Sequence, residues 1–189
     1  MAWDDAGEAI VAGSGEVYVA PVGTTLPTTA EQSLPIIWEG LGYHTEDGVT
    51  VSNAPEITEL RVWQARYPIR RQRDTENFTV SFSLVQWNEV NVPLAFGGGT
   101  VVSDGGSGYK YSPPSPEDSI VEKALIVDVL DGDTVGRFVV PRGNAVEAVE
   151  ANFRRTELAT LPITFSALES EGVPAWTFYT NSAGFAAGS

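Results

Sequence analysis

One stretch, residues 75–99 (TENFTVSFSLVQWNEVNVPLAFGGG), most restricts what this chain can fold into. In its first half, apolar and small polar residues alternate strictly. The apolar positions are Phe78, Val80, Phe82 and Leu84. A period of two that includes aromatic and β-branched residues is typical of a strand with one buried and one solvated face. The pattern therefore predicts a strand over residues 76–86.

The alternation stops at Trp87, and the chain then changes character. Residues 88–96 predict a short helix that ends at three consecutive glycines, because glycine takes the left-handed conformation without steric cost. Pro93 lacks a backbone donor, so we expect the helix to begin near Asn91.

Shorter patterns elsewhere predict more strands than helices. Expected strands cover residues 16–21, 36–43, 44–52, 109–111, 119–130, 135–140, 156–168 and 176–180. We expect the Asp47-Gly48 pair to mark a turn between the second and third of these strands. The run at 119–130 is almost continuously apolar, which predicts that both of its faces are covered. A little helix is expected around residues 145–151, and the fold class is mainly β.

Length and composition set the domain organisation. At 189 residues with 42% hydrophobic content, the chain is long enough for one core. We expect a flexible arm at 1–15, one β domain at 16–180 and a flexible tail at 181–189. The acidic N-terminal stretch lacks the pattern of a signal peptide, and no window approaches about 18 consecutive apolar residues, so we expect a soluble protein.

Charge is the most informative part of the composition. Eleven Lys and Arg stand against 25 Asp and Glu, a formal net charge of −14. Binding to nucleic acid requires basic patches that neutralise phosphates, so this balance argues against a nucleic-acid-binding protein. The excess of carboxylates fits simple solubility. It fits equally a surface that lies beside a polyanion without adhering to it.

The only basic block lies in residues 53–74, which hold five of the nine arginines. Alternation around Trp63 suggests that part of it is extended, while Pro68 argues against a central strand. One interpretation is a solvated loop whose charges balance nearby acids. The other is an interaction loop that docks on an acidic surface of another copy, since arginine pairs well with carboxylates.

Candidate catalytic and metal-binding patterns are weak. His44 is the only histidine, no serine lies in a nucleophile elbow, and cysteine is absent. The run DVLDGD at residues 128–133 lacks the ligand series of a calcium loop and is better explained as a hairpin turn. We therefore expect no enzyme, no metal and no cofactor. Long one-sided strands, terminal arms and an arginine-rich segment instead favour assembly with other copies.

Six segments, in the same order along the chain, resemble the major tail tube proteins of long non-contractile-tailed bacteriophages, particularly those that infect actinobacteria. They are GEVYVAPVGTTLP at 15–27, WEGLGYHTEDGVTVS at 38–52, WQ at 63–64, ENFTVSFSLVQWNEVNVPLAFGGG at 76–99, ALIVDVLDGD at 124–133 and LPITFSAL at 161–168. The resemblance spans nearly the whole chain.

The resemblance implies a β-sandwich with one flanking helix, whose inner strands join a ring-wide barrel in a hexamer. Rings would stack into a tube through which DNA passes without specific binding, its acidic lining repelling phosphate. Implied partners are other copies, a tape-measure protein, a tail terminator and tail-tip proteins. The protein would be made in the host cytoplasm and end in the virion.

The resemblance also assigns candidate residues. By position, residues 53–74 match a loop that reaches the next ring, so the candidates for contacts between subunits or rings are Arg61, Trp63, Arg66, Arg70, Arg71 and Arg73. Candidates for the lumen are Thr79, Ser81, Ser83, Thr160, Thr164 and Ser166. Alternatives are a capsid- or surface-decorating β-domain and the tube protein of a contractile tail.

Overall fold

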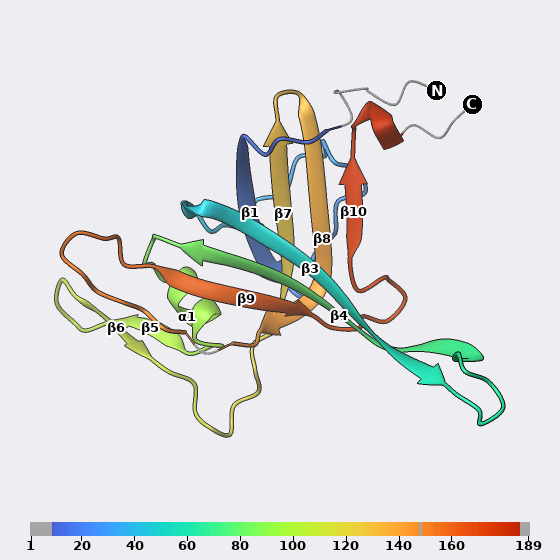
Figure 1. Ribbon diagram of the computed structural model, residues 1–189. Coiled ribbons are helices and arrows are strands. Elements are labelled where there is room, and N and C mark those ends of the chain that lie inside the picture. Colours follow the sequence, from blue (N-terminus) through green and yellow to red (C-terminus); the bar gives the residue numbers. More distant parts are fainter. Residues whose placement is uncertain (1–8, 148, 186–189) are drawn as a thin grey trace.

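One large antiparallel sheet, bent back on itself, forms most of the protein (Figure 1). The computed structural model describes residues 9–147 and 149–185. The large sheet has the strand order β2-β1-β7-β8-β9-β4-β3, with β10 added beside β8. Its strands are β1 (Ser14–Pro21), β2 (Glu39–Gly40), β3 (His44–Leu60), β4 (Arg70–Leu84), β7 (Lys123–Asp131), β8 (Thr134–Ala145), β9 (Leu161–Ala167) and β10 (Thr177–Thr180). Separate from it are a hairpin of β5 (Thr100–Ser103) and β6 (Tyr109–Ser112), the helix α1 (Asn91–Ala95) and a 3-10 turn (Ala183–Phe185).

Strand β8 is the corner at which the sheet folds. Its first part pairs with β7, while its end, from Gly143 to Ala145, pairs with β9. Figure 1 shows β1, β7, β8 and β10 running together while β3, β4 and β9 cross in front of them. The two halves enclose the main core, as in a sandwich whose sheets cross at a large angle. The predicted mainly β fold with one short helix is confirmed. Among the described residues the sheet ends at β2 and β3 and does not close into a barrel.

Strand β4 supplies one wall of this core. The predicted alternation is confirmed: the even positions from Phe78 to Leu84 are at most 4% exposed, and the hydroxyl residues between them are partly exposed. Across the core they meet Val17 and Val19 of β1 and Leu125 and Val127 of β7. One strand thus presents a dry face to the body and a wet face outward.

Helix α1 covers an open end of the core and begins at Asn91, as Pro93 predicted. The Asn88 side chain accepts hydrogen bonds from the backbone N–H groups of Val90 (3.0 Å) and Asn91 (2.8 Å), which would otherwise lack partners. The buried Asn91 amide donates to the carbonyls of Leu41 (3.0 Å) and Gln86 (2.9 Å) and so ties the helix to both neighbouring loops.

Strand β7 is covered on both faces, which confirms the interpretation of its apolar run. Ala124 and Ile126 contact a second cluster beneath Trp38, on the face opposite to the main core. On that face the buried Arg137 guanidinium pairs with Asp128 at 2.6 Å and donates to the carbonyl of Gln32 at 2.7 Å. The Arg137 guanidinium thus holds the loop around Gln32 against this face of the sheet.

Several local predictions were wrong. Asp47 and Gly48 do not turn the chain between two strands: they lie inside β3, where the register with β4 shifts between His44 and Val49. Gly48 adopts φ +70° there, so the positive φ that suggested a turn serves an irregularity within a strand. Residues 36–43 contain only the two-residue strand β2.

Other errors concern where strands begin and end. Strand β8 continues to Ala145, and the described part of residues 146–151 is irregular rather than helical. Strand β9 begins at Leu161, five residues later than predicted, because residues 156–160 form a turn and an irregular approach. The β5 strand was not predicted at all; it pairs with the predicted strand at residues 109–111.

The predicted terminal arms are only partly described. Strand β1 already begins at Ser14, and the Gly13 N–H donates to the Leu130 carbonyl at 3.0 Å. Asn181 of the predicted tail donates to the Asp133 carbonyl at 3.0 Å. Residues 1–8 and 186–189 lie outside the described residues. The division at 15 and 181 therefore stays a prediction.

The corner in β8 generates a first test, because it requires glycine. A Cβ built on Gly143 would lie 2.4 Å from both the Phe165 ring and the Ser166 carbonyl oxygen. We expect Gly143→Ala to lower the free energy of unfolding by about 1–3 kcal/mol through overpacking. Urea unfolding followed by circular dichroism measures it. Gly106→Ala, in an exposed loop, is the control and should change stability by less than about 0.5 kcal/mol. Equal stability of both variants would contradict the assignment of the corner.

Candidate functional site

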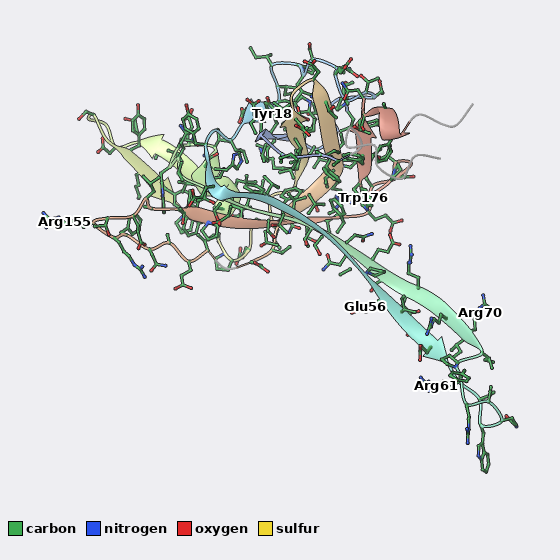
Figure 2. All side chains as sticks on the ribbon, turned by 45° about the horizontal axis from the view of Figure 1, so that its top comes forward. Tyr18, Glu56, Arg61, Arg70, Arg155 and Trp176 are labelled. Atoms are coloured by element: carbon green, nitrogen blue, oxygen red, sulfur yellow. The ribbon has the colours of Figure 1, made fainter. Side chains whose placement is uncertain are left out.

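The most unusual feature of the molecule is a two-stranded ribbon that projects from the body (Figures 1 and 2). Strands β3 and β4 pair continuously from the body outward to the pair of Leu60 and Arg70. Strand β9 pairs with β4 only between residues 79 and 84, so no third strand of the described structure lies beside residues 54–60 and 70–77. A two-stranded hairpin without a covering layer is marginally stable in water. The interpretation of residues 53–74 as a loop is thus corrected: two strands flank a short tip at residues 61–69.

Polar contacts between its strands hold the ribbon in register. The cross-strand hydrogen bonds and ion pairs join Glu56 to Thr75 (3.1 Å), Thr58 to Asp74, and Glu59 to Arg71 (3.1 Å). Glu59 also accepts from Arg61 at 2.7 Å, and the hydrogen bonds from Arg61 and then Arg71 lower the pKa of its carboxyl group. Exposed pairs of this kind contribute less than about 1 kcal/mol each. They fix the shape of the ribbon without making it a core.

Large apolar side chains at the ribbon's end are exposed to solvent. Trp63 is 99% exposed and Tyr67 is 81% exposed, and Leu60, Val62 and Ile69 are exposed as well. Large exposed apolar patches mark contact sites with other molecules. This apolar set, together with Arg61, Arg66 and Arg70 around it, is called the ribbon tip below.

All six residues predicted to make contacts between subunits lie on this one appendage. Arg70, Arg71 and Arg73 lie on β4, and the other three candidates lie in the turn at residues 61–69. Arg73 pairs with Glu76, while Arg66 and Arg70 make no ion pair with any residue that the structure describes. Their role in contacts between copies stays a prediction. The sequence analysis missed their apolar neighbours Leu60 and Ile69. The only sequence signal for these two is that apolar residues occur among charged ones in this segment.

A second surface is the outer face of strands β3, β4 and β9, opposite to the core. Paired residues form rows across the three strands: Ser52, Thr79 and Ser166 in one, Thr50, Ser81 and Thr164 in the next. Ser81 and Thr164 lie within hydrogen-bond distance at 3.3 Å, and Ser166 donates to Asn77 at 3.2 Å. We call these two rows, together with Ser83, the hydroxyl face.

Five of the six predicted lumen residues lie on the hydroxyl face, and one does not. Thr160 precedes β9, where the chain is irregular, so it lies outside the strand pairing that aligns the others. Sequence reasoning missed Thr50 and Ser52 of β3, which complete the rows. The alternation from residue 49 to residue 52 was visible, but the expected turn at Asp47-Gly48 separated it from the neighbouring pattern. Whether the face lines a lumen stays a prediction.

The hydroxyl face carries carboxylates at its border. Thr164 donates to the Glu147 carboxylate at 2.6 Å. A hollow of about 210 Å³ lies beside it, lined by Asp47 and Glu147 as well as by Ser81, Ser83 and Thr164. None of the residues in the two rows is charged. The face is therefore a neutral hydroxyl surface with acidic groups at one edge.

The outer edge of β3 is open along its length. Strand β3 ends the sheet, so among the described residues no strand pairs with its far side over 17 residues. Pro55 is tolerated there because an edge strand does not need every backbone donor. Exposed edges of this length invite pairing with another chain. The fold thus leaves three unsatisfied surfaces: the ribbon tip, the hydroxyl face and the β3 edge.

Catalytic chemistry has little support in the described part of the chain. No group of three or more His, Cys, Asp or Glu residues is placed to hold a metal ion in that part. The lone histidine, His44, lies edge-on against Phe82 with ring centroids 5.8 Å apart, and burial lowers its pKa. Its Nε2 atom is buried and has no hydrogen-bond partner among the described residues. None of the helices described is long and apolar enough to cross a membrane.

The exposed ribbon tip generates a second test. Leu60 and Arg70 are directly paired, so an Asn-Gly turn in place of residues 61–69 closes the same hairpin with a tight loop. Because the tip contributes nothing to the core, we expect urea unfolding to show a stability change below about 0.5 kcal/mol. Phe165→Ala, at a position that is 0% exposed, is the control and should lose about 3–5 kcal/mol. A loss as large in the shortened protein would mean that the tip stabilises the body.

The comparisons with known proteins agree with a structural role. The model of a family described as phage tail tube protein matches residues 1–188. No curated protein matches the chain.

Proposed function

The chain belongs to the phage tail tube protein family, and from this premise we propose that its copies form hexameric rings that stack into the tube of a non-contractile tail. A structural part in the tail tube follows from the family itself, which is a family of virion proteins rather than of enzymes. The ring, its lumen and its stacking are the proposal. DNA would pass through the lumen, and the partners would be a tape-measure protein, a tail terminator and tail-tip proteins.

The ribbon is the observation that supports the proposal most. Residues 54–60 and 70–77 extend past the core, and the tip exposes Trp63 almost completely. A free subunit gains nothing from such an appendage, because ordering it costs conformational entropy and buries no apolar surface. Contact with a neighbouring copy would recover that cost. We propose that the ribbon makes the contact between rings.

The open edge of β3 supports closure of the ring. A sheet that does not close within one subunit can close through strand pairing between subunits, which removes the exposed edges. The four strands β8, β9, β4 and β3 would then form one segment of a barrel shared by the ring. This arrangement would place the hydroxyl face on the inside of the barrel.

The chemistry of the hydroxyl face suits passage of DNA. Serine and threonine side chains hydrate well, and the two rows contain no arginine or lysine that would bind phosphate. Asp47 and Glu147 at the border would add repulsion toward the DNA backbone. The chain's net charge of −14 acts in the same direction. DNA could then slide rather than adhere.

A decorating β-domain was the main alternative. Acidity and terminal arms fit it as well, but it does not require a long ribbon or an open edge strand. The family match favours the tube.

The ribbon's arginines provide a third test. Replacing Arg70, Arg71 and Arg73 together by alanine should raise the protein concentration needed for tube formation by about tenfold or more, since each tenfold corresponds to about 1.4 kcal/mol. Electron microscopy and pelleting of the assembled protein measure it. The free subunit should keep its fold, because these side chains are exposed.

The matched control is Arg154→Ala with Arg155→Ala, two exposed neighbouring arginines. Arg155 lies at the side of the molecule opposite to the ribbon (Figure 2). Tubes that form at the parent concentration from the triple variant would contradict a role of these arginines between rings. An equal loss in the control would point to a general charge effect instead.

Accessibility of the hydroxyl face provides a fourth test. The chain has no cysteine, so Thr50→Cys places a single thiol on that face. In free subunits, a small maleimide and a maleimide coupled to a globular protein should both react. In tubes, only the small reagent should react, because a lumen excludes the large one. Equal labelling of tubes by both reagents would place the face outside.

A further inference from the structure

A groove lies at the end of β3 that is opposite to the ribbon tip. It has a volume of about 680 Å³ and is formed by the start of β1, by β2 and by the first residues of β3. Ser14, Gly40 and Gly48 contribute small side chains or none, and Tyr43 stands at the margin, 74% exposed. A hollow of this size accommodates aromatic side chains together with a short piece of backbone.

One wall of this groove is an unused strand edge. Strand β1 pairs with β2 only at Tyr18 and Val19. On that side, Ser14, Gly15 and Glu16 have no strand partner among the described residues. An incoming segment can therefore form backbone hydrogen bonds along β1 as well as side-chain contacts.

The charges that line the groove are negative. Glu16 and Glu46 are both exposed and unpaired by any cation that the structure describes, and Asp128 is already paired with Arg137. In the part of the chain that the structure describes, no arginine or lysine lines the groove. An occupant that carries cations beside aromatic rings would be complementary to it.

The ribbon tip has this composition. Trp63 and Tyr67 are exposed rings, and Arg66 and Arg70 have no ion pair among the described residues. Residues 53–74 carry a formal charge of +2, whereas the remainder of the chain carries −16. The tip is thus a basic, aromatic element on an otherwise acidic protein.

The tip does not reach the groove of its own molecule. Tyr18, which lines the groove, lies on the body, and Arg61 and Arg70 lie at the far end of the ribbon (Figure 2). Both sites belong to β3, whose 17 residues span roughly 50 Å at about 3.3 Å per residue. Translating one copy along this strand therefore brings its tip toward the groove of the next.

We propose that the ribbon tip of one copy docks in the groove between β1 and β3 of a copy in the neighbouring ring. This inference rests on the proposed tube function and names the surface that receives the ribbon. The contact is heterologous, because tip and groove are different surfaces, and between copies related by a translation such a contact propagates without closing. It therefore extends a tube by any number of rings.

Cross-linking between two single-cysteine variants tests the contact. Glu46→Cys places a thiol in the groove and Arg66→Cys places one at the tip, and the parent chain has no cysteine. Both variants are mixed, assembled into tubes and treated with a short bis-maleimide. We expect a covalent dimer that contains one chain of each kind. The control pairs Arg66→Cys with Glu117→Cys, an exposed position away from the groove.

Each outcome is decisive. A mixed dimer well above the control supports the groove as the receiving surface. Tubes in which the groove pair cross-links no more than the control overturn this contact and leave the tube function standing. Parent protein that forms no tubes, even with tail-tip proteins added, overturns the tube function and the contact with it.

Charge exchange gives an independent readout on assembled protein. Glu46→Arg should lower the yield of tubes about tenfold, and Arg66→Glu should do the same. One chain that carries both changes restores the complementary pair at every contact and should recover tubes. Full assembly by Glu46→Arg alone would contradict the proposal, and so would a failure of the double variant to recover while each free subunit stays folded.

Discussion

The ladder between β3 and β4 is the interaction on which the rest of the structure depends. Over residues 78–84 it lies on the main core, where each second side chain of β4 is buried. From Asn77 outward to Arg70 the same ladder continues, but none of the residues in this part of β3 and β4 is buried. Burial therefore holds one end of the strand pair, and the other end is held only by backbone bonds and exposed ion pairs. A single pair of strands thereby joins the core of the body to the exposed ribbon tip.

The part of this ladder over the core could be predicted from the sequence because its information is local. The alternation from Phe78 to Leu84 predicts the strand, its buried face and its solvated face from only seven residues. The start of α1 at Asn91 was equally local, since Pro93 tolerates only the first turn. The double coverage of β7 followed from its continuous apolar run. The hydroxyl residues of β4 and β9 were placed on the solvated face for the same reason, with Thr160 as the exception, and their place in a lumen stays a prediction.

The ribbon could not be predicted in this way, because cross-strand contacts hold it together and few of its side chains are buried. Glu59 and Arg71 are twelve residues apart, and their ion pair has no periodic signature. With both faces in water, no alternation of apolar and polar residues is required, and Pro55 and Pro68 are tolerated at an edge and in a turn. The bend at Gly143 was missed for a similar reason: it depends on the approach of Phe165 from a strand distant in the sequence.

Charge explains how such a chain can remain separate before it assembles. Outside residues 53–74 each copy carries −16, so two bodies repel one another in most orientations. In the proposed contact, the basic ribbon would reverse this repulsion in one direction, along β3 toward the groove that holds Glu16 and Glu46. Screening limits the effect to about 8–10 Å at physiological salt, so the attraction acts once a tip is already near a groove. Repulsion between bodies and the proposed attraction at one end would together favour ordered stacking over random association.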